Sequence, residues 1–274
     1  MPKQLMMPDD RDAALAADLL SRVESAVDPN ERDTRVVILA GGRGARLEPY
    51  TSVLPKPLMP IGNRAILEIL VEQLADAGLR DLTLCVGYLS HLIRAVFDST
   101  ADHRMRISYV QEHEPLGTAG PLLLVDGLTS TFLVMNGDLL TTFEYGAFLD
   151  HHRASGNVLS IATHRRHLVS DYGVLRFGSN GDDPLRILAY DEKPVVNLDV
   201  SMGIYAIEPK ALAYVPKGVR SDLPDLVDKL LEDGQRVGAF PFEGLWLDIG
   251  RHEDYEEAVR LWERAGPVDA HVDV

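Results

Sequence analysis

One segment constrains this chain more than any other: a short apolar run that leads directly into a loop of three glycines. Residues 36–40, VVILA, have the β-branched, apolar character of a buried strand. Gly41, Gly42 and Gly44 follow at once. Because they lack side chains, their backbone N–H groups can approach an anion or a base closely. The segment therefore predicts a phosphate-binding loop at the end of a strand.

Two common phosphate-binding motifs do not fit this loop. A dinucleotide fingerprint that begins at Gly42 requires glycine or alanine at position 47, which is leucine here, and this argues against a nicotinamide-dependent dehydrogenase. A P-loop requires GxxxxGK[ST], which none of the three glycines begins. The loop instead carries Arg46 and is followed by Lys56, which has proline on both sides. The prolines restrict the backbone there, so a fixed ammonium is predicted beside the phosphate loop.

Strand-like and helical segments alternate along the chain. Strand-like runs occur at 36–40, 82–86, 107–111, 132–135 and 158–163, and helical spacing occurs at 65–77, 90–97, 118–125 and 144–154. In the second half, strand-like runs at 173–177, 186–190, 203–207 and 236–241 are interleaved with helical segments at 211–214, 223–232 and 252–264. This order predicts an α/β fold: a mostly parallel, Rossmann-like sheet with helices on both faces, whose ligands bind beyond the carboxyl ends of the strands.

The two ends of the chain differ from this pattern. Residues 12–27 have helical spacing and are followed by the helix-breaking sequence DPN, so residues 1–34 are interpreted as an N-terminal helical extension. Residues 267–274 are interpreted as a tail. The sequence thus predicts a single α/β domain over 35–266.

Charge and composition exclude several classes of partner. The chain carries 27 basic and 42 acidic side chains, a net charge of -15. This acidity disfavours nonspecific binding to nucleic acid and to anionic membranes, since both depend on lysine and arginine. No apolar run is long enough to span a bilayer, and the single cysteine, Cys85, lies within an apolar run. We expect a soluble, cytoplasmic protein with no nucleic-acid or membrane partner.

The combined motifs resemble those of the sugar-phosphate nucleotidylyltransferases, also called NDP-sugar pyrophosphorylases. The signature of that family is a strand, then GGxGxRLxPxT, then PKP. The matching residues are Gly41, Gly42, Gly44, Arg46, Leu47, Pro49, Thr51, Pro55, Lys56 and Pro57. Ala45 stands where threonine or serine is common. The resemblance identifies residues 35–266 as a nucleotidyltransferase domain with a GT-A-like sheet.

The resemblance also implies an activity and a set of site residues. An enzyme of this family joins a nucleoside triphosphate to a sugar or sugar-like 1-phosphate and releases pyrophosphate and an NDP-sugar. By resemblance, Arg46 and Lys56 are catalytic, and Asp138 and Asp248 hold Mg²⁺. The positions that match nucleotide-binding residues are Ala40, Gly41, Gly42, Gly44, Gln111, Gly117 and Thr118, and those that match sugar-phosphate-binding residues are Gly173, Glu192, Lys193, Ser201 and Gly203.

Some of these positions also have an ordinary structural explanation beside the functional one. Asp138 follows the buried run 132–135, where an aspartate is also typical of a turn. Thr118 opens a helical segment and would also suit an N-cap. Ser201 stands where many family members carry asparagine, and serine occurs in the ADP-glucose-forming branch, so the sugar stays open. The histidines at 151–152, 164 and 167 lack metal-ligand spacing and are predicted to lie on the surface.

The base of the nucleotide is the least constrained feature. The segment PLGTAGP most resembles mannose-1-phosphate and heptose-1-phosphate guanylyltransferases, so GTP is favoured over the adenylyl, uridylyl and thymidylyl alternatives. A noncatalytic regulatory homologue would be expected to lose the charged residues, all of which are present. A glycosyltransferase of similar fold would need a DxD after a strand, but the only DxD lies at 10–12. Assemblies are frequent in the family, which leaves a homo-oligomer open.

Overall fold

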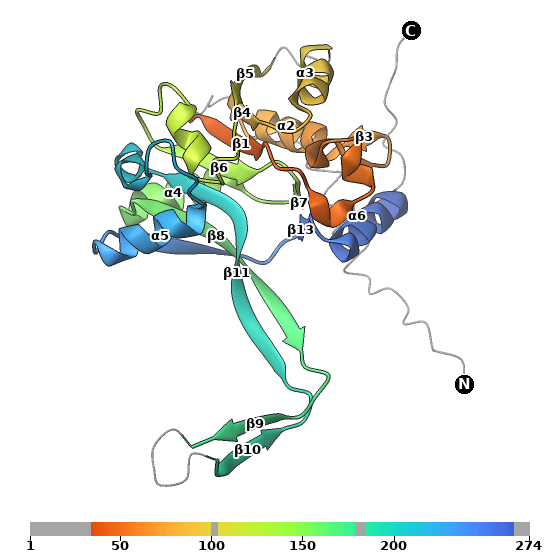
Figure 1. Cartoon of the computed structure of the whole chain (residues 1–274), viewed down its shortest axis with the longest axis vertical. Helices are drawn as coiled ribbons and strands as arrows, with labels where there is room; N and C mark the ends of the chain where they lie inside the picture. Colours follow the sequence, from red (N-terminus) through yellow and green to blue (C-terminus); the bar gives the residue numbers. More distant parts are fainter. Residues whose placement is uncertain (1–33, 100–103, 179–184, 266–274) are drawn as a thin grey trace.

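The centre of the fold is a seven-stranded sheet (Figure 1). Its strands lie in the order β12 (Val237–Phe242), β8 (Leu159–Val169), β11 (Val195–Ile207), β6 (Phe132–Asn136), β1 (Val36–Ala40), β4 (Asp81–Val86) and β5 (Arg106–Gln111). Neighbouring strands are parallel except that β11 is antiparallel to both β6 and β8. This computed structural model describes residues 34–99, 104–178 and 185–265. The predicted mostly parallel α/β fold is confirmed.

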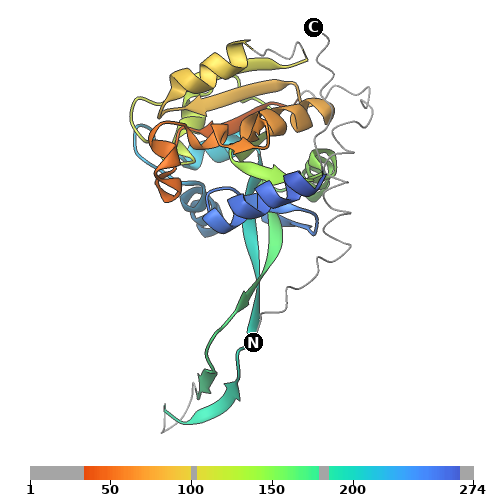
Figure 2. The ribbon, with the colours of Figure 1, turned by 90° about the vertical axis from the view of Figure 1, so that its right-hand side faces the viewer.

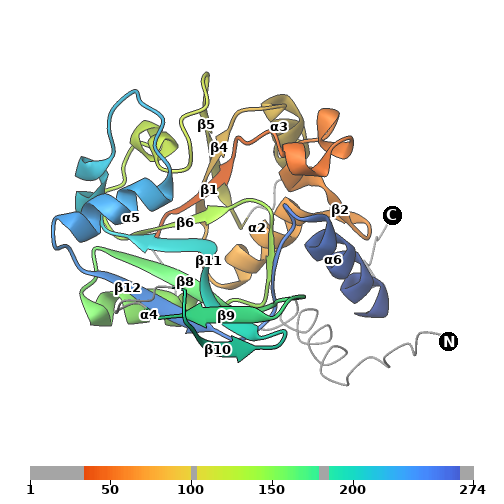
Figure 3. The same cartoon turned by 60° about the horizontal axis from the view of Figure 1, so that its bottom comes forward.

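Helices and short elements surround this sheet. The α-helices are α2 (Ile66–Asp76), α3 (Ser90–Ser99), α4 (Tyr145–Ser155), α5 (Leu223–Glu232) and α6 (His252–Ala265). The short strands are β2 (Pro60–Ile61), β3 (Arg64–Ala65), β7 (Leu139–Thr141), β9 (Val174–Phe177), β10 (Ile187–Asp191) and β13 (Trp246–Asp248). The 3-10 turns are η1 (Ala45–Leu47), η2 (Tyr50–Ser52), η3 (Lys56–Leu58), η4 (Gly120–Leu124) and η5 (Pro209–Tyr214). Figure 3 shows α6 beside β2, on the opposite side of the molecule from α5.

Two segments expected to be α-helical are 3-10 turns, and two further segments lie outside the described residues. The segments predicted at 118–125 and 211–214 are the 3-10 turns η4 and η5. Pro121 and Pro209 stand in the first turn of η4 and η5, where proline is tolerated because the first N–H groups of a helix have no partner within it. The N-terminal extension, apart from Thr34, and the tail lie outside the described residues. No helix of the described chain is long and apolar enough to cross a membrane.

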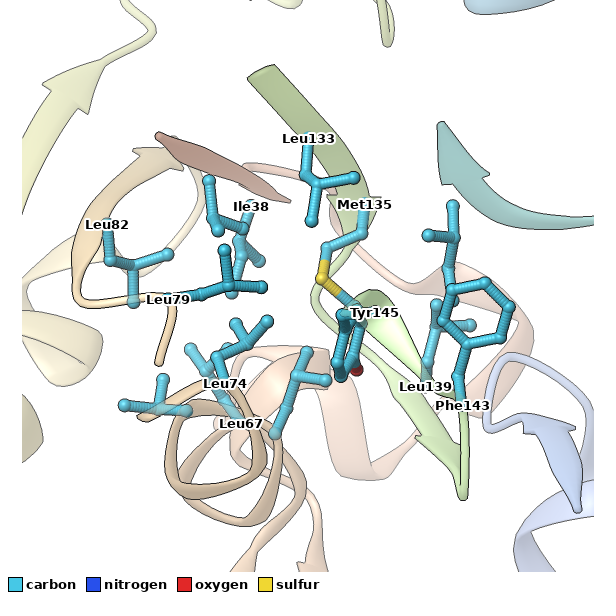
Figure 4. Packing of buried hydrophobic residues seen from close by; sticks show 14 of the residues in the cluster. Ile38, Leu67, Leu74, Leu79, Leu82, Leu133, Met135, Leu139, Phe143 and Tyr145 are labelled. Atoms are coloured by element: carbon cyan, nitrogen blue, oxygen red, sulfur yellow. The ribbon is translucent and has the colours of Figure 1, made fainter. Parts of the chain in front are cut away.

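Strand β1 divides the core into two clusters. Val36 and Ile38 pack on one face with α2, α3 and α4, whereas Val37 packs on the other face with Cys85 and α5. Figure 4 shows the first cluster, in which Leu67 of α2 faces Ile38. All of these side chains are fully buried. Burial on both faces fixes the position of β1, and therefore the position of the glycine loop that follows it.

A third cluster joins the C-terminal helix to the loops that follow β1. Leu261 of α6 packs with Leu47, Ile66 and Leu247, all of them buried. Beside this cluster, β13 pairs antiparallel with β7, so that Asp248 lies opposite Leu139. Segments near residues 47, 140 and 248 are thereby held together although they are far apart in the sequence.

Strands β8 and β11 continue beyond the sheet as a two-stranded arm, defined here as residues 165–200. β12 pairs with β8 only as far as His164, and β6 pairs with β11 only from Ile204. Beyond these points β8 and β11 have only each other, and β9 and β10 form a small sheet at the far end. Figures 1 and 2 show the arm projecting from the rest of the described chain, here called the body. The sequence had predicted the strands at 173–177 and 186–190 that are β9 and β10, but it ended the strand before the arm at residue 163 and began the strand after it at residue 203, so the outer parts of β8 and β11 were missed.

One histidine is buried where a surface residue was predicted. His152 lies in α4 with 1% of its side chain exposed. Its ring nitrogens lie 2.8 Å from Ser160 Oγ and 3.1 Å from Glu208 Oε1. The prediction was wrong because His152 follows Phe148 by four residues and therefore shares the inward face of α4. Burial lowers the pKa of His152, and the Glu208 carboxylate opposes that shift.

Candidate functional site

A cleft of about 1150 Å³ opens at the carboxyl ends of β1, β4, β5 and β6. Its walls are residues 39–46, Lys56, Pro57, Gly87, Tyr88, residues 111–115, Gly117, Thr118, Asn136, Asp138, Arg220 and Asp222. Ligands bind at this edge in open parallel sheets. Every predicted nucleotide position lines the cleft: Ala40, Gly41, Gly42, Gly44, Gln111, Gly117 and Thr118.

The surroundings and the backbone conformation differ among the three glycines of the loop. A Cβ at Gly41 would collide with the carboxylate of Glu112, and the carbonyl of Gly41 accepts a hydrogen bond from the N–H of Tyr88 at 3.1 Å. Gly44 has a φ of 65°, which favours glycine. A Cβ at Gly42 would meet no atom within 4 Å, so its backbone borders open space in the cleft. The loop thus leaves room for a ligand to approach the main chain.

Lys56 lies between the two aspartates that the resemblance paired. Its ammonium forms an ion pair with Asp138 and lies 3.6 Å from Asp248 Oδ1. The two acidic residues are brought together by the β7–β13 pairing, with the N–H of Ile249 donating to the carbonyl of Asp138 at 3.1 Å. Burial raises the pKa of Asp138, the Lys56 ammonium opposes the rise, and Asp248 adds to it. The pairing of residues 138 and 248 was beyond what the sequence alone could demonstrate.

Arg46 completes this charged group from η1, and Gly250 marks the point of convergence. A Cβ at Gly250 would lie 3.0 Å from Arg46 Nη2 and 2.9 Å from Asp248 Oδ1, and it would collide with the Lys56 ammonium. The N–H of Gly250 donates to Asp248 Oδ1 at 2.9 Å. Sequence reasoning did not single out Gly250. Gly250 follows Asp248 by two residues in the sequence WLDIG, residues 246–250. The crowding of side chains around Gly250 appears only in the fold.

Glu112 is a second residue that sequence reasoning missed. It lines the cleft directly after Gln111, at the end of β5. Burial raises the pKa of Glu112, and a hydrogen bond from the N–H of Leu116 to Glu112 Oε2, at 3.3 Å, acts against that rise. The signal in the sequence was a carboxylate at the carboxyl end of a strand, the same signal that drew attention to Asp138.

The opposite wall of the cleft comes from the segment before α5, which the sequence had not indicated. Asp222 Oδ1 accepts a hydrogen bond from the N–H of Thr118 at 2.9 Å, and the hydroxyl of Thr118 accepts one from the N–H of Leu223 at 2.7 Å. Thr118 therefore satisfies the first turn of α5 rather than that of its own segment. Arg220 lines the same wall.

Three of the predicted sugar-phosphate residues lie together at the end of the arm. The Tyr190 hydroxyl donates to Glu192 Oε2 at 2.7 Å, and a Cβ at Gly173 would collide with that hydroxyl. Lys193 follows with a φ of 46°, a conformation that non-glycine residues seldom adopt. No described residue of the arm is among those that line the cleft. Figure 1 shows β9 and β10 at the end of the molecule remote from β1 and β4.

Ser201 and Gly203 lie where the arm joins the body. The hydroxyl of Ser201 lies 2.9 Å from that of Tyr205 and accepts a hydrogen bond from the N–H of Gly203 at 3.2 Å. Gly203 has a φ of 73°, and a Cβ there would collide with Asn136, which lines the cleft. The pairing of β11 with β8 shifts register between Ser201 and Tyr205. Ser201 and Gly203 therefore lie at the base of the arm, whereas Gly173, Glu192 and Lys193 lie further out, between the β8–β11 ladder and the β9–β10 sheet.

Known proteins similar to this chain are found by family and by sequence. The family model for nucleotidyl transferases matches residues 35–264. The chain is 34% identical over 228 residues to a mannose-1-phosphate guanyltransferase of Aspergillus fumigatus, covering 81% of this chain and 62% of that protein. It is 32% identical over 246 residues to a UTP–glucose-1-phosphate uridylyltransferase of Synechocystis, covering 82% and 62%. The chain thus spans less than two thirds of the length of these curated relatives.

Solved structures agree as well. HddC from Yersinia pseudotuberculosis, complexed with GMP-PN, superposes with a TM-score of 0.64 at 25% identity, covering 83% of this chain and 98% of that one. A glucose-1-phosphate thymidylyltransferase described as putative, from Bacillus anthracis, has the same fold, with a TM-score of 0.65 at 21% identity and coverage of 84% and 95%. The family that the motifs indicated is confirmed: the chain belongs to the nucleotidyl transferase family.

Proposed function

We propose that this chain transfers the nucleotidyl group of a nucleoside triphosphate, preferably GTP, to a sugar or sugar-like 1-phosphate, releasing pyrophosphate and an NDP-sugar. One observation carries the proposal: four charged side chains converge at one end of a glycine-lined cleft, namely Arg46, Lys56, Asp138 and Asp248. A noncatalytic nucleotide-sugar-binding homologue would not need this group.

The proposed reaction is a single displacement at the α-phosphorus. A phosphate oxygen of the sugar 1-phosphate forms a new bond to the α-phosphorus. The bond from the α-phosphorus to the oxygen that bridges to the β-phosphorus breaks, and its electron pair leaves with pyrophosphate. A phosphate monoester is already anionic at neutral pH, so no protein base is required. Positioning and electrostatics then supply the acceleration.

Two basic residues of the body carry these roles in the proposal. Lys56 stabilises the charge that develops at the α-phosphate, and Arg46 holds the triphosphate and the leaving pyrophosphate. The Lys56 side chain is 12% exposed and paired to Asp138, so its position is set before the substrate arrives. Preorganised charge of this kind gains more in the transition state than a mobile surface lysine would.

A divalent metal, Mg²⁺ in this proposal, fits the acidic residues. Asp138 and Asp248 lie beside the cleft around one ammonium. Among the described residues no three or more His, Cys, Asp or Glu gather to enclose an ion. Two carboxylates suit Mg²⁺, which keeps water and substrate phosphates among its ligands. When bound, the ion would supply positive charge against the phosphates.

Glu112 supports GTP as the nucleotide. An ionised carboxylate only accepts hydrogen bonds, and guanine presents two adjacent donors, N1–H and N2–H, on its Watson–Crick edge. Uracil and thymine present a single donor between two carbonyl oxygens, which a carboxylate repels. Burial raises the pKa of Glu112, and the hydrogen bond from the N–H of Leu116 opposes that rise and so favours the charged form. The uridylyltransferase among the relatives keeps UTP as the first alternative, followed by ATP and dTTP.

The remaining parts of the proposal concern the sugar-phosphate residues, the bounds of the catalytic domain and the compartment. Gly173, Glu192, Ser201 and Gly203 would bind the sugar, and Lys193 would pair with its phosphate. We keep residues 35–266 as the catalytic domain. A reducing, cytoplasmic compartment is supported by the single cysteine, Cys85, which is buried and unpaired and whose pKa burial raises to about 12.

The test is pyrophosphate release from each of the four triphosphates, with Mg²⁺ and a panel of sugar 1-phosphates. We expect release with GTP above the others, and only when a sugar 1-phosphate is present. The variant Glu112→Gln should reduce the preference for GTP over UTP by roughly 10- to 100-fold, the value of one charged hydrogen bond. Glu253→Gln, at a side chain that is 88% exposed, is the matched control. Absence of release with every triphosphate would overturn the proposal.

A further inference from the structure

The arm exposes an unusual amount of apolar surface. Most exposed large apolar side chains of the described residues lie between positions 168 and 198, with exposures from 39% to 80%. They are Leu168, Val169, Tyr172, Val174, Leu175, Phe177, Leu185, Ile187, Leu188, Tyr190, Val195, Val196 and Leu198. All four residues of β9 are exposed, so both faces of the β9–β10 sheet lack cover. A two-stranded sheet is marginally stable alone in water, and a large exposed apolar surface marks a protein interface.

The base of the arm is fixed to the body, so the arm cannot easily fold back onto its own cleft. Arg166 forms an ion pair with Asp254 of α6 at 3.0 Å, and its guanidinium lies 4.9 Å from the centre of the Trp246 ring. The indole N–H of Trp246 donates to the carbonyl of Met202 at 3.0 Å. From Ser201 outward to the end of the β8–β11 ladder the register is continuous. A return of the arm to its own body would break these contacts, whereas reaching another molecule breaks none.

The cleft and the arm each hold what the other lacks. The cleft has the glycine loop and the Lys56 group, and no described arm residue lines it. The arm holds Gly173, Glu192 and Lys193 close together, away from that cleft. Each copy of the chain therefore offers one cleft and one arm. An exchange of arms between two copies would satisfy both needs with a single two-fold symmetry, the commonest form of assembly.

We propose that two copies of this chain exchange arms, so that the exposed apolar arm surface packs on the partner and places Glu192 and Lys193 of one chain at the nucleotide cleft of the other. This inference rests on the proposed function for its sugar-phosphate half. Each complete site is then formed by two chains, with the triphosphate held by one body and the sugar 1-phosphate held by the arm of the second copy.

The experiment combines two variants that are defective in different halves of the site. Lys56→Ala removes the charge of the cleft, and Lys193→Ala removes that of the arm. The two chains, carrying different tags, are co-expressed, and the doubly tagged dimer is purified and assayed for pyrophosphate release beside each parent. In an exchanged heterodimer one of the two sites contains both intact lysines. At a sugar 1-phosphate concentration below the wild-type KM, a random mixture should therefore reach about a quarter of wild-type activity, and the purified heterodimer about half, while each parent stays low.

Three results would decide the question. Activity of the heterodimer well above both parents supports the exchange. A heterodimer no more active than its parents, beside an active wild type, overturns it, because the arm then serves its own chain. If the wild type is inactive with every substrate pair, the proposed function fails separately. The exchange is then judged by light scattering: we expect a dimer that the double variant Leu175→Ser, Ile187→Ser turns into a monomer, and a monomeric wild type or an unaffected dimer overturns it.

Discussion

In the body, β1 lies between β4 and β6, and its side chains pack into core clusters on both faces of the sheet, whereas β9 at the end of the arm has only β10 beside it and all four of its residues are exposed. The body can therefore fix the groups proposed to be catalytic by burial within one chain. The arm holds its predicted ligands near one another but has no surface of its own to hold them against a substrate. The comparison indicates that the two halves of the proposed site are stabilised in different ways.

The largest expected difference is in the free energy of unfolding when a phenylalanine is replaced in the body or in the arm. Phe148→Ala should lower the free energy of unfolding by about 3–5 kcal/mol, because the ring is fully buried and lies 5.4 Å from the rings of both Phe143 and Phe240. Phe177→Ala, at a side chain that is 49% exposed, should lower it by less than about 1 kcal/mol in dilute solution.

Denaturant unfolding at the lowest chain concentration that fluorescence allows measures both values. At higher concentration the effect of Phe177→Ala should grow, since arm exchange would cover that ring. Equal effects of the two substitutions in dilute solution would remove the contrast between body and arm.

The next largest effect is expected in catalysis by the body. Lys56→Ala should lower turnover by roughly 100- to 1000-fold, the loss seen when one preorganised charge-stabilising group is removed. The fold should persist, as judged by circular dichroism and the unfolding midpoint. Lys217→Ala, at an exposed position, is the matched control. Near-normal turnover of the Lys56 variant would show that the charged group of the cleft is not catalytic.

A smaller effect is expected from the arm. Lys193→Ala should raise the KM for the sugar 1-phosphate by roughly 10- to 100-fold, the value of one hydrogen bond to a charged group. The KM for GTP should stay within a factor of two, because no described arm residue lines the cleft. Steady-state kinetics with each substrate varied in turn separates the two constants, and Lys210→Ala provides the exposed control. An equal rise in both constants would contradict the division between body and arm.

The smallest effect concerns pH and the buried histidine of the body. Burial holds the pKa of His152 below its ordinary value of 6.5. Below pH 6.5 the unfolded chain therefore binds a proton at this residue that the folded chain does not. The stability is fully present above this pH and should fall as the pH is lowered, by at most about 1.4 kcal/mol per pH unit. Denaturant unfolding between pH 5 and 8 should show a flatter dependence in His152→Gln, with His151→Gln as the matched control. An unchanged slope would contradict this.

The parts of the fold that the sequence predicted are those with a strong local signal. Residues 36–40 are continuously apolar because both faces of β1 are covered, and residues 252–264 have helical spacing because one face of α6 packs on Leu47 and Leu247. The outer halves of β8 and β11 were missed because pairing between them, rather than burial, keeps them extended. The outer part of β8, residues 163–169, shows no alternation of apolar and polar types, and the alternation in residues 196–201 of β11 was overlooked.

The features of the site also divide into those with a local sequence signal and those that depend on the fold. The glycine loop and Lys56 were predictable because the chemistry is contained in consecutive residues. The proximity of Asp138 to Asp248 depends on the β7–β13 pairing, and the crowding at Gly250 depends on side chains from three segments. The distance between Lys193 and the cleft depends on the direction of the arm, which no local pattern encodes.

The most direct test of the whole account is ³¹P nuclear magnetic resonance of the wild-type chain with GTP, Mg²⁺ and mannose 1-phosphate or a heptose 1-phosphate. We expect the resonances of a nucleotide diphosphate sugar and of pyrophosphate to appear together in equal amounts, and only when all the components are present. Orthophosphate in place of pyrophosphate, or GTP left unchanged with every sugar 1-phosphate, would contradict the proposal that the cleft and the arm together form the site of a nucleotidylyltransferase.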